Sequence, residues 1–231
     1  MPAAIFDMDG VLVISNSAHF EAWKAFGKRY GIEIDEPTYY KHVNGRRNDE
    51  FLEELYPGRW TQEERLRIAA EKEAYYREHF APKVPRVPGV VELIQALAQR
   101  DVPLAVATSG PRENAELITQ LLGVRSLFRV MVAGLDVTVA KPDPAIFLEA
   151  ARRLGLPPAE CVVFEDSPAG VEAAIRAGAY CVGVATSEPA EVLRAKGAHE
   201  AVEDFTGFDV DGLLARLSAP GRADSLPGDL S

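Results

Sequence analysis

After Met1 and Pro2 the chain runs Ala3-Ala4-Ile5-Phe6-Asp7-Met8-Asp9-Gly10, a short apolar stretch that ends in two acidic residues and a glycine. Four later apolar stretches, at residues 104–107, 129–133, 161–164 and 180–184, have the same form, and helical patterns follow them. Continuous hydrophobicity is typical of strands buried on both faces, and alternation with helices indicates a parallel sheet. We therefore predict a doubly wound, Rossmann-like parallel-sheet α/β domain.

Residues 16–84 interrupt this pattern because they show only helical periodicity, at 19–30, 37–42, 48–55 and 61–80. By count they contain 12 of the 19 aromatic residues, and their net charge is 12 − 13 = −1, against 13 − 22 = −9 for the remainder. We predict an inserted all-helical domain at 16–84 and an α/β core formed by 1–15 and 85–231. A frayed polar tail is expected from residue 218 onward.

The composition excludes several classes of protein. With 47% hydrophobic and 26% charged residues the chain is an ordinary globular protein, and its net charge of −10 argues against nucleic acid or anionic membrane as a partner. No apolar run reaches the roughly 18 residues that cross a bilayer, and the N-terminus has no leader pattern. We expect a cytoplasmic monomer. Its two cysteines, Cys161 and Cys181, are expected to be buried thiols.

Polar residues follow the predicted strands, where an open parallel sheet binds its ligands. They comprise four carboxylates, one lysine and two hydroxyls, namely Asp7, Asp9, Thr108, Ser109, Lys141, Glu165 and Asp166. Four carboxylates in one crevice repel one another unless cations intervene, and oxygen ligands favour Mg²⁺ over Zn²⁺. The predicted metal-binding residues are Asp7, Asp9, Glu165 and Asp166.

These groups suit phosphoryl transfer through an aspartyl-phosphate intermediate. Asp7 would attack phosphorus, and Asp9 would protonate the leaving oxygen and then deprotonate the water or hydroxyl that attacks the phosphoenzyme. Thr108, with the backbone N–H groups around Ser109 and Gly110, would hold the non-bridging phosphoryl oxygens. Lys141 would offset the charge between nucleophile and phosphate.

Four segments carry these residues in order: Phe6-Asp7-Met8-Asp9-Gly10-Val11-Leu12, Ala107-Thr108-Ser109-Gly110, Ala140-Lys141-Pro142-Asp143-Pro144 and Phe164-Glu165-Asp166-Ser167-Pro168-Ala169-Gly170. They resemble the four motifs of the haloacid dehalogenase-like (HAD) hydrolase superfamily. The helical insertion is similar to the cap of the subfamily that contains β-phosphoglucomutase and small sugar phosphatases. The resemblance implies Mg²⁺ dependence, the aspartyl-phosphate and a cap that closes over the substrate.

The inserted helices contain further candidates for substrate binding. His19 lies in a stretch that resembles the one by which β-phosphoglucomutase-type enzymes couple cap closure to the second aspartate, and Lys72 stands where they carry a cap lysine. Arg46 and Arg47 are candidates for bidentate binding of a substrate phosphate. Asn48, in contrast, stands where the mutase has the arginine that holds the distal phosphate.

The resemblance narrows the reaction but leaves alternatives open. Asp9 argues against dehalogenases, which lack it, and against phosphonatases, which replace it with a small residue. Residues 108–114 lack the Lys-Asn pair of the mutase. We therefore predict a phosphatase, a phosphoric monoester hydrolase acting on a small phosphorylated metabolite such as a sugar phosphate. The alternative is a β-phosphoglucomutase-like phosphohexomutase, in which a sugar hydroxyl replaces water as the attacking group.

Two other classes of protein fit less well. A phosphorylatable receiver protein also has an Asp-Lys-Mg²⁺ crevice, but receivers are shorter and lack a helical insertion after the first strand. A nicotinamide-binding protein would need a G-x-G-x-x-G turn where this chain has Asp7-Met8-Asp9-Gly10.

Overall fold

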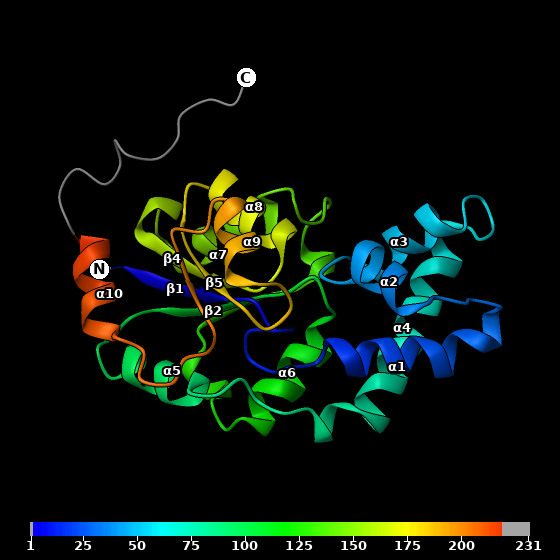
Figure 1. Ribbon diagram of the computed structural model, residues 1–231, viewed down its shortest axis with the longest axis horizontal. Coiled ribbons are helices and arrows are strands. Elements are labelled where there is room, and N and C mark those ends of the chain that lie inside the picture. Colours follow the sequence, from blue (N-terminus) through cyan, green and yellow to red (C-terminus); the bar gives the residue numbers. More distant parts are fainter. Residues whose placement is uncertain (1, 219–231) are drawn as a thin grey trace.

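The computed structural model describes residues 2–218, which form an α/β body and a smaller helical body beside it (Figure 1). Apart from Ser218, the predicted tail lies outside the described residues. The α/β body is built on six parallel strands in the order β3-β2-β1-β4-β5-β6, so the order reverses between β1 and β4. The strands are β1 Ala3–Phe6, β2 Leu104–Ala107, β3 Val130–Val132, β4 Cys161–Glu165, β5 Tyr180–Val184 and β6 Glu200–Val202. This arrangement confirms the predicted doubly wound fold.

Helices cover both faces of the sheet because strand side chains alternate in direction. One face, which includes Phe6 and Val106, packs against α5, α6 and α10, and the other, which includes Ile5 and Ala105, packs against α7, α8 and α9. Both cysteines are buried in the second face, as expected. The helices are α5 Val90–Ala98, α6 Arg112–Leu121, α7 Ala145–Leu154, α8 Pro168–Arg176, α9 Ala190–Ala195 and α10 Val210–Ser218.

The helical segment, residues 16–84, leaves the sheet after β1 and returns to α5. It contains α1 Asn16–Gly27, α2 Glu36–Thr38, α3 Asn48–Leu55 and α4 Gln62–His79. An aromatic cluster holds it together, with the Trp23 ring edge-on to Phe51 at a centroid distance of 5.0 Å. Tyr76 and Ala81, however, pack into the apolar layer of the α/β body, so the two cores meet near the end of α4.

Several elements differ from the sequence predictions. The helix expected at 37–42 is one α-turn followed by five π-helical residues, Tyr39–Val43. Strand β6 and helix α10 were not predicted, because all three residues of β6 are only half-buried and Asp211 and Gly212 interrupt the start of α10. Helix α1 also begins earlier than predicted, at Asn16 and not at His19, and its first residues contribute to the site described below.

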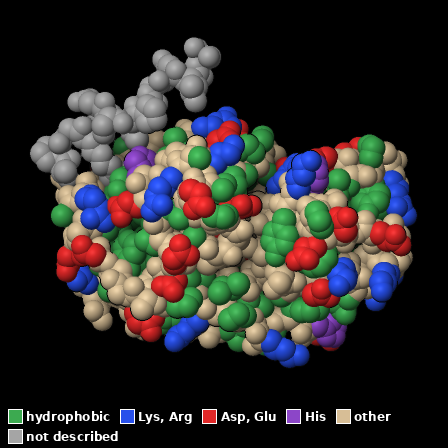
Figure 2. Space-filling model, viewed as in Figure 1, with side chains coloured by type: hydrophobic (Ala, Val, Ile, Leu, Met, Phe, Trp, Pro, Cys, Tyr) green, Lys and Arg blue, Asp and Glu red, His purple; other side chains and the backbone are tan. Residues whose placement is uncertain are grey.

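The surface offers no broad cationic patch on the face shown in Figure 2, where Lys and Arg side chains are interspersed with Asp and Glu. Within residues 2–218, no helix has both the length and the apolar composition needed to span a bilayer.

We expect Phe51→Ala to lower the free energy of unfolding by about 3–5 kcal/mol, the usual range for removing a buried aromatic ring. Phe51 is fully buried, whereas the control residue Leu121 is 53% exposed. Leu121→Ala should therefore change stability by about 0.5 kcal/mol or less. Urea unfolding measures both values, and equal effects of the two substitutions would contradict the proposed core.

Candidate active site

The reversal of strand order places the predicted catalytic residues together. Phe6 of β1 pairs with Phe164 of β4, so the residues that follow them, Asp7 and Glu165, lie next to each other. On the other side of β1, strand β2 leads into Thr108. A crevice at such a reversal is where doubly wound sheets bind ligands.

Lys141 lies between the two carboxylates at the centre of this crevice. Its Nζ donates to Asp7 Oδ1 at 2.7 Å and to Glu165 Oε1 at 2.5 Å, and its side chain is 2% exposed. Burial alone would lower the pKa of Lys141, but the negative charges of Asp7 and Glu165 raise it well above its usual value. The lysine therefore remains an ammonium ion.

Glu165 holds Lys141 in place and is itself fixed by the start of α8. Its Oε2 accepts hydrogen bonds from the backbone N–H of Ser167 at 2.7 Å and from the Ser167 hydroxyl at 3.0 Å. A side chain at position 170 would overlap the Glu165 carboxylate, so only glycine fits there. Both Glu165 oxygens are thus engaged by protein groups.

Asp7, Glu165 and Asp166 form the group of acidic side chains that suits a metal ion, with candidate ligand oxygens within 4.8 Å of one another. Three carboxylates and one ammonium leave a formal charge of −3 + 1 = −2. Burial, only partly offset by Lys141, raises the pKa of Asp7 to about 7, and burial with the charge of Glu165 raises that of Asp166. A divalent cation would neutralise this excess charge, and the all-oxygen donor set fits Mg²⁺.

Asp9 is turned away from that group toward the helical segment. Its Oδ1 accepts a hydrogen bond from the Ser15 hydroxyl and lies 3.2 Å from His19 Nε2. Burial would raise the pKa of Asp9, but His19 and Ser15 outweigh burial and lower it. Lys72 Nζ lies 2.6 Å from His19 Nδ1, so the ammonium donates to Nδ1 and the ring donates from Nε2 to Asp9.

Glu73 joins this chain of contacts to the α/β body, and the sequence did not indicate it. Its Oε1 accepts from Lys72 Nζ at 2.8 Å and from Asn48 Nδ2 at 2.7 Å. Its Oε2 accepts from Asn114 Nδ2, on α6, at 2.6 Å. Burial would raise the pKa of Glu73, but the charge of Lys72 and the hydrogen bonds from Lys72 and Asn114 lower it to about 2. Nothing in the charged sequence around Glu73 distinguishes it from its exposed neighbours.

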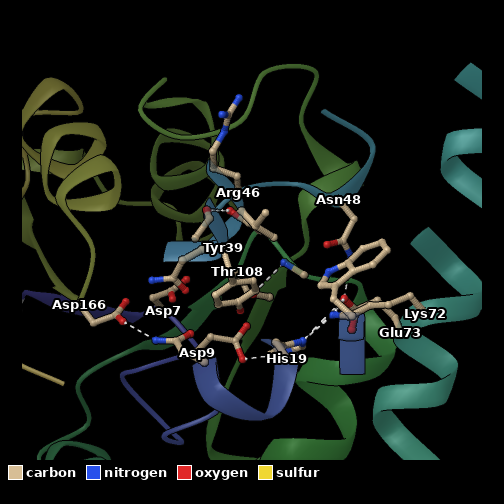
Figure 3. Close-up of a pocket in the computed structure, with 17 residues that line it drawn as sticks. Asp7, Asp9, His19, Tyr39, Arg46, Asn48, Lys72, Glu73, Thr108 and Asp166 are labelled. Atoms are coloured by element: carbon tan, nitrogen blue, oxygen red, sulfur yellow. Dashed lines mark hydrogen bonds and ion pairs between the residues drawn. The ribbon is translucent and has the colours of Figure 1, made fainter. Parts of the chain in front are cut away.

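A cavity between the two bodies brings most of these side chains together (Figure 3). Asp7, Asp9 and Asp166 lie at one end, and Lys72 and Glu73 lie at the other. The further residues along its wall are Asn16, His19, Trp23, Tyr39, Val43, Asn44, Gly45, Arg46, Asn48, Thr108, Ser109 and Gly110. Lys141 is not part of the wall; it approaches Asp7 from within the α/β body.

The two adjacent arginines have separate partners. Arg46 points away from the cavity, where it forms an ion pair with Glu54. Arg47 makes two hydrogen bonds to Asp49, at 3.1 and 2.8 Å, and does not line the cavity. Arg46 thus contributes to the cavity wall while its guanidinium is paired with Glu54, and the role of either arginine in substrate binding stays a prediction.

The loop after β2 lines the cavity and also contacts the helical segment. The Gly110 N–H donates to Thr108 Oγ1 at 3.0 Å and orients that hydroxyl. The Ser109 hydroxyl donates a hydrogen bond to the Gly45 carbonyl of the helical segment at 3.0 Å.

Residues 1–178 match the haloacid dehalogenase-like hydrolase family. The chain belongs to this family. The hydrolase is 37% identical over 193 residues to validoxylamine A 7'-phosphate phosphatase of Streptomyces hygroscopicus subsp. limoneus, a match that covers 82% of this chain and 88% of the relative. It is also 31% identical over 196 residues to β-phosphoglucomutase of Bacillus subtilis, covering 82% and 85%.

A solved structure agrees with this assignment. A family IA HAD hydrolase from Entamoeba histolytica superposes on the hydrolase with a TM-score of 0.82 and 28% identity, covering 95% of this chain and all of that one. The family and fold predicted from the four motifs are confirmed. The predicted enzyme class, a phosphoric monoester hydrolase, agrees with the family and with a phosphatase among its relatives.

We expect the stabilising effect of Glu73 to depend on pH. Its native pKa of about 2 lies below the ordinary value of 4.5. Ionised Glu73 therefore stabilises the fold at neutral pH, and this contribution is lost as the pH falls from the unfolded value toward the native one. Urea unfolding should show Glu73→Gln less stable than the parent at pH 7, with a smaller difference at pH 3.

Glu78→Gln provides the control, because Glu78 is an exposed carboxylate on the same helix. Its effect should be small at both pH values. If the loss of stability caused by Glu73→Gln were the same at pH 7 and pH 3, the stabilising effect of Glu73 would not come from its charge.

Proposed function

We propose that this hydrolase is a Mg²⁺-dependent phosphatase that hydrolyses a small phosphorylated metabolite, a sugar phosphate, through an aspartyl-phosphate on Asp7. The observation that carries the proposal is the buried contact of Lys141 with Asp7 and Glu165 at the reversal of strand order. The lysine fixes one oxygen of Asp7, and the other oxygen is the one we assign to attack.

In the proposed reaction an Asp7 oxygen forms a bond to phosphorus while the bond from phosphorus to the sugar oxygen breaks. The Asp9 carboxylate relays a proton from the substrate monoanion to that leaving oxygen, and it then takes one from the water that attacks the phosphoenzyme and passes it to the released phosphate. The contacts of Asp9 with Ser15 and His19 both fall on Oδ1, so we assign proton transfer to Oδ2. Water attack on phosphorus releases phosphate and restores the Asp7 carboxylate.

We assign the non-bridging phosphoryl oxygens to Thr108 and to the backbone N–H of Ser109. The Thr108 hydroxyl is oriented by the Gly110 N–H. When bound, Mg²⁺ would neutralise phosphoryl charge, and Asp7 and Asp166 are the carboxylates we assign to hold it. We assign Glu165 to the positioning of Lys141, because both of its oxygens already accept hydrogen bonds, one from Lys141 and one from Ser167.

The polar groups of the cavity wall favour a substrate that carries hydroxyl groups. Tyr39, Asn44 and Asn48 contribute polar groups to the wall. The name of the phosphatase that shares 37% identity, and that of a phosphorylated carbohydrates phosphatase of Thermotoga maritima at 35%, point to the same substrate class.

A phosphohexomutase is the second candidate, because the β-phosphoglucomutase of Bacillus subtilis is also a relative. Its chemistry requires a sugar that carries a second phosphate. On this wall, however, Asn48 and Lys72 both bind Glu73, and Arg46 points outward. These contacts favour the phosphatase. The monomeric state and cytoplasmic location expected from the sequence remain predictions.

We expect a panel of hexose phosphates to release inorganic phosphate in the presence of Mg²⁺, with Asp7→Asn reducing the rate to background because an amide is a poor nucleophile. Asp101→Asn is the matched control, because Asp101 is exposed and its φ of 59° suits asparagine. Released phosphate and sugar isomers are measured in parallel. Isomerisation of β-glucose 1-phosphate with little phosphate release would favour the mutase, and turnover by Asp7→Asn would contradict the nucleophile.

We also expect Mg²⁺ to raise the melting temperature of the apo protein, since an ion that binds only the folded state stabilises it. Asp166→Asn should abolish most of this increase by removing one negative charge from the carboxylate group. The control is Asp204→Asn, a half-buried residue of the α/β body that lies outside that group. Equal responses to Mg²⁺ in both variants would exclude Asp166 as a ligand, whatever the activity.

A further inference from the structure

A groove adjoins the cavity at the seam between the helical segment and the α/β body. One side of the groove is a face of α4, formed by Leu66, Ala69, Ala70, Glu73 and Arg77, which recur at helical spacing. The opposite side includes Pro111, Gly134 and Leu135 of the α/β body. At its Arg77 end the helix is anchored to the α/β body, because Arg77 Nη1 donates to Asn114 Oδ1 at 2.8 Å.

The groove and the cavity share four wall residues, namely Asn48 and Glu73 from the helical segment and Ser109 and Gly110 from the α/β body. The cavity has a volume of about 50 Å³, and that of the groove is about 130 Å³. A substrate that is larger than the cavity would therefore extend into the groove, past the residues that the two share.

The charged groups of the groove are largely paired. Arg47 is bound by Asp49, and Glu73 is bound by Lys72. The wall includes two arginines against the three carboxylates of Asp49, Glu73 and Glu113, so no excess positive charge is present to hold a second phosphate. Leu66, Leu135 and the two alanines present apolar surface instead, and Leu135 is 68% exposed.

We propose that the groove binds the uncharged distal part of the substrate, so that a sugar monophosphate carrying a second neutral ring binds more tightly than a simple hexose phosphate. The inference rests on the proposed function, since the phosphoryl group must lie at Asp7. Ala69 and Ala70 determine this specificity, because a larger side chain at either position would fill the space between α4 and Leu135.

The test measures inhibition constants of two probes against p-nitrophenyl phosphate hydrolysis with Mg²⁺ present. Glucose 6-phosphate represents the single ring, and trehalose 6-phosphate adds a neutral second ring. In the parent protein we expect trehalose 6-phosphate to bind about tenfold more tightly, because the C–H face of its second ring would pack against the apolar side chains of the groove. Ala70→Trp should bring the two constants close together by weakening trehalose 6-phosphate alone.

Ala74→Trp is the matched control, because Ala74 is exposed one turn further along α4 and does not line the groove. It should retain the preference of the parent. The groove proposal would be overturned if the two probes inhibited the parent equally, or if Ala70→Trp weakened both probes to the same extent. Hydrolysis of p-nitrophenyl phosphate in the same assay would still uphold the phosphatase. Absence of that hydrolysis would overturn both.

Discussion

The ammonium of Lys141, buried between Asp7 and Glu165, is the interaction on which the site depends. Removing three carboxylates from water is costly, and each must find a cation or hydrogen-bond donors. Lys141 supplies one positive charge, and Ser167 supplies donors to Glu165. The proposed Mg²⁺ would offset the remaining negative charge. The cation and Lys141 would then act on an anionic substrate at contact distance, whereas the net charge of −10 is screened.

The sheet makes this contact possible. Because β1 and β4 are parallel neighbours in register, their ends deliver Asp7 and Glu165 to the same edge. The required backbone also excludes larger residues, since a side chain at Gly10 would overlap Asp166 and one at Gly170 would overlap Glu165. The Asp-x-Asp-Gly and Glu-Asp-x-x-x-Gly spacings therefore reflect packing as well as chemistry.

Most of the α/β site was predictable because its residues lie at or directly after the end of a strand, and parallel strands end at a common edge. Lys141 lies further along the chain, between β3 and α7. The positions of Arg46 and Arg47 were not, because two adjacent arginines look alike in sequence and only packing directs one to Glu54 and the other to Asp49.

Glu73 was missed for a related physical reason. Its partner Asn114 lies 41 residues away, on a helix of the other body, so their contact depends on how the helical segment packs. The groove beside α4 is likewise a product of that packing. The position of residues relative to one strand or helix was enough to predict most of the α/β site. Contacts between the helical segment and the α/β body, in contrast, could be found only from the three-dimensional structure.

The claim that Asp7 receives the phosphoryl group is tested most directly by locating the phosphoenzyme. Protein quenched in acid during turnover of p-nitrophenyl phosphate is reduced with borohydride, which converts an acyl phosphate to an alcohol, and digested for mass spectrometry. The account predicts homoserine at position 7, with more of it in Asp9→Asn because that variant hydrolyses the phosphoenzyme slowly. Reduction at another aspartate or glutamate, or phosphate on a different side chain while position 7 is unmodified, would contradict the account.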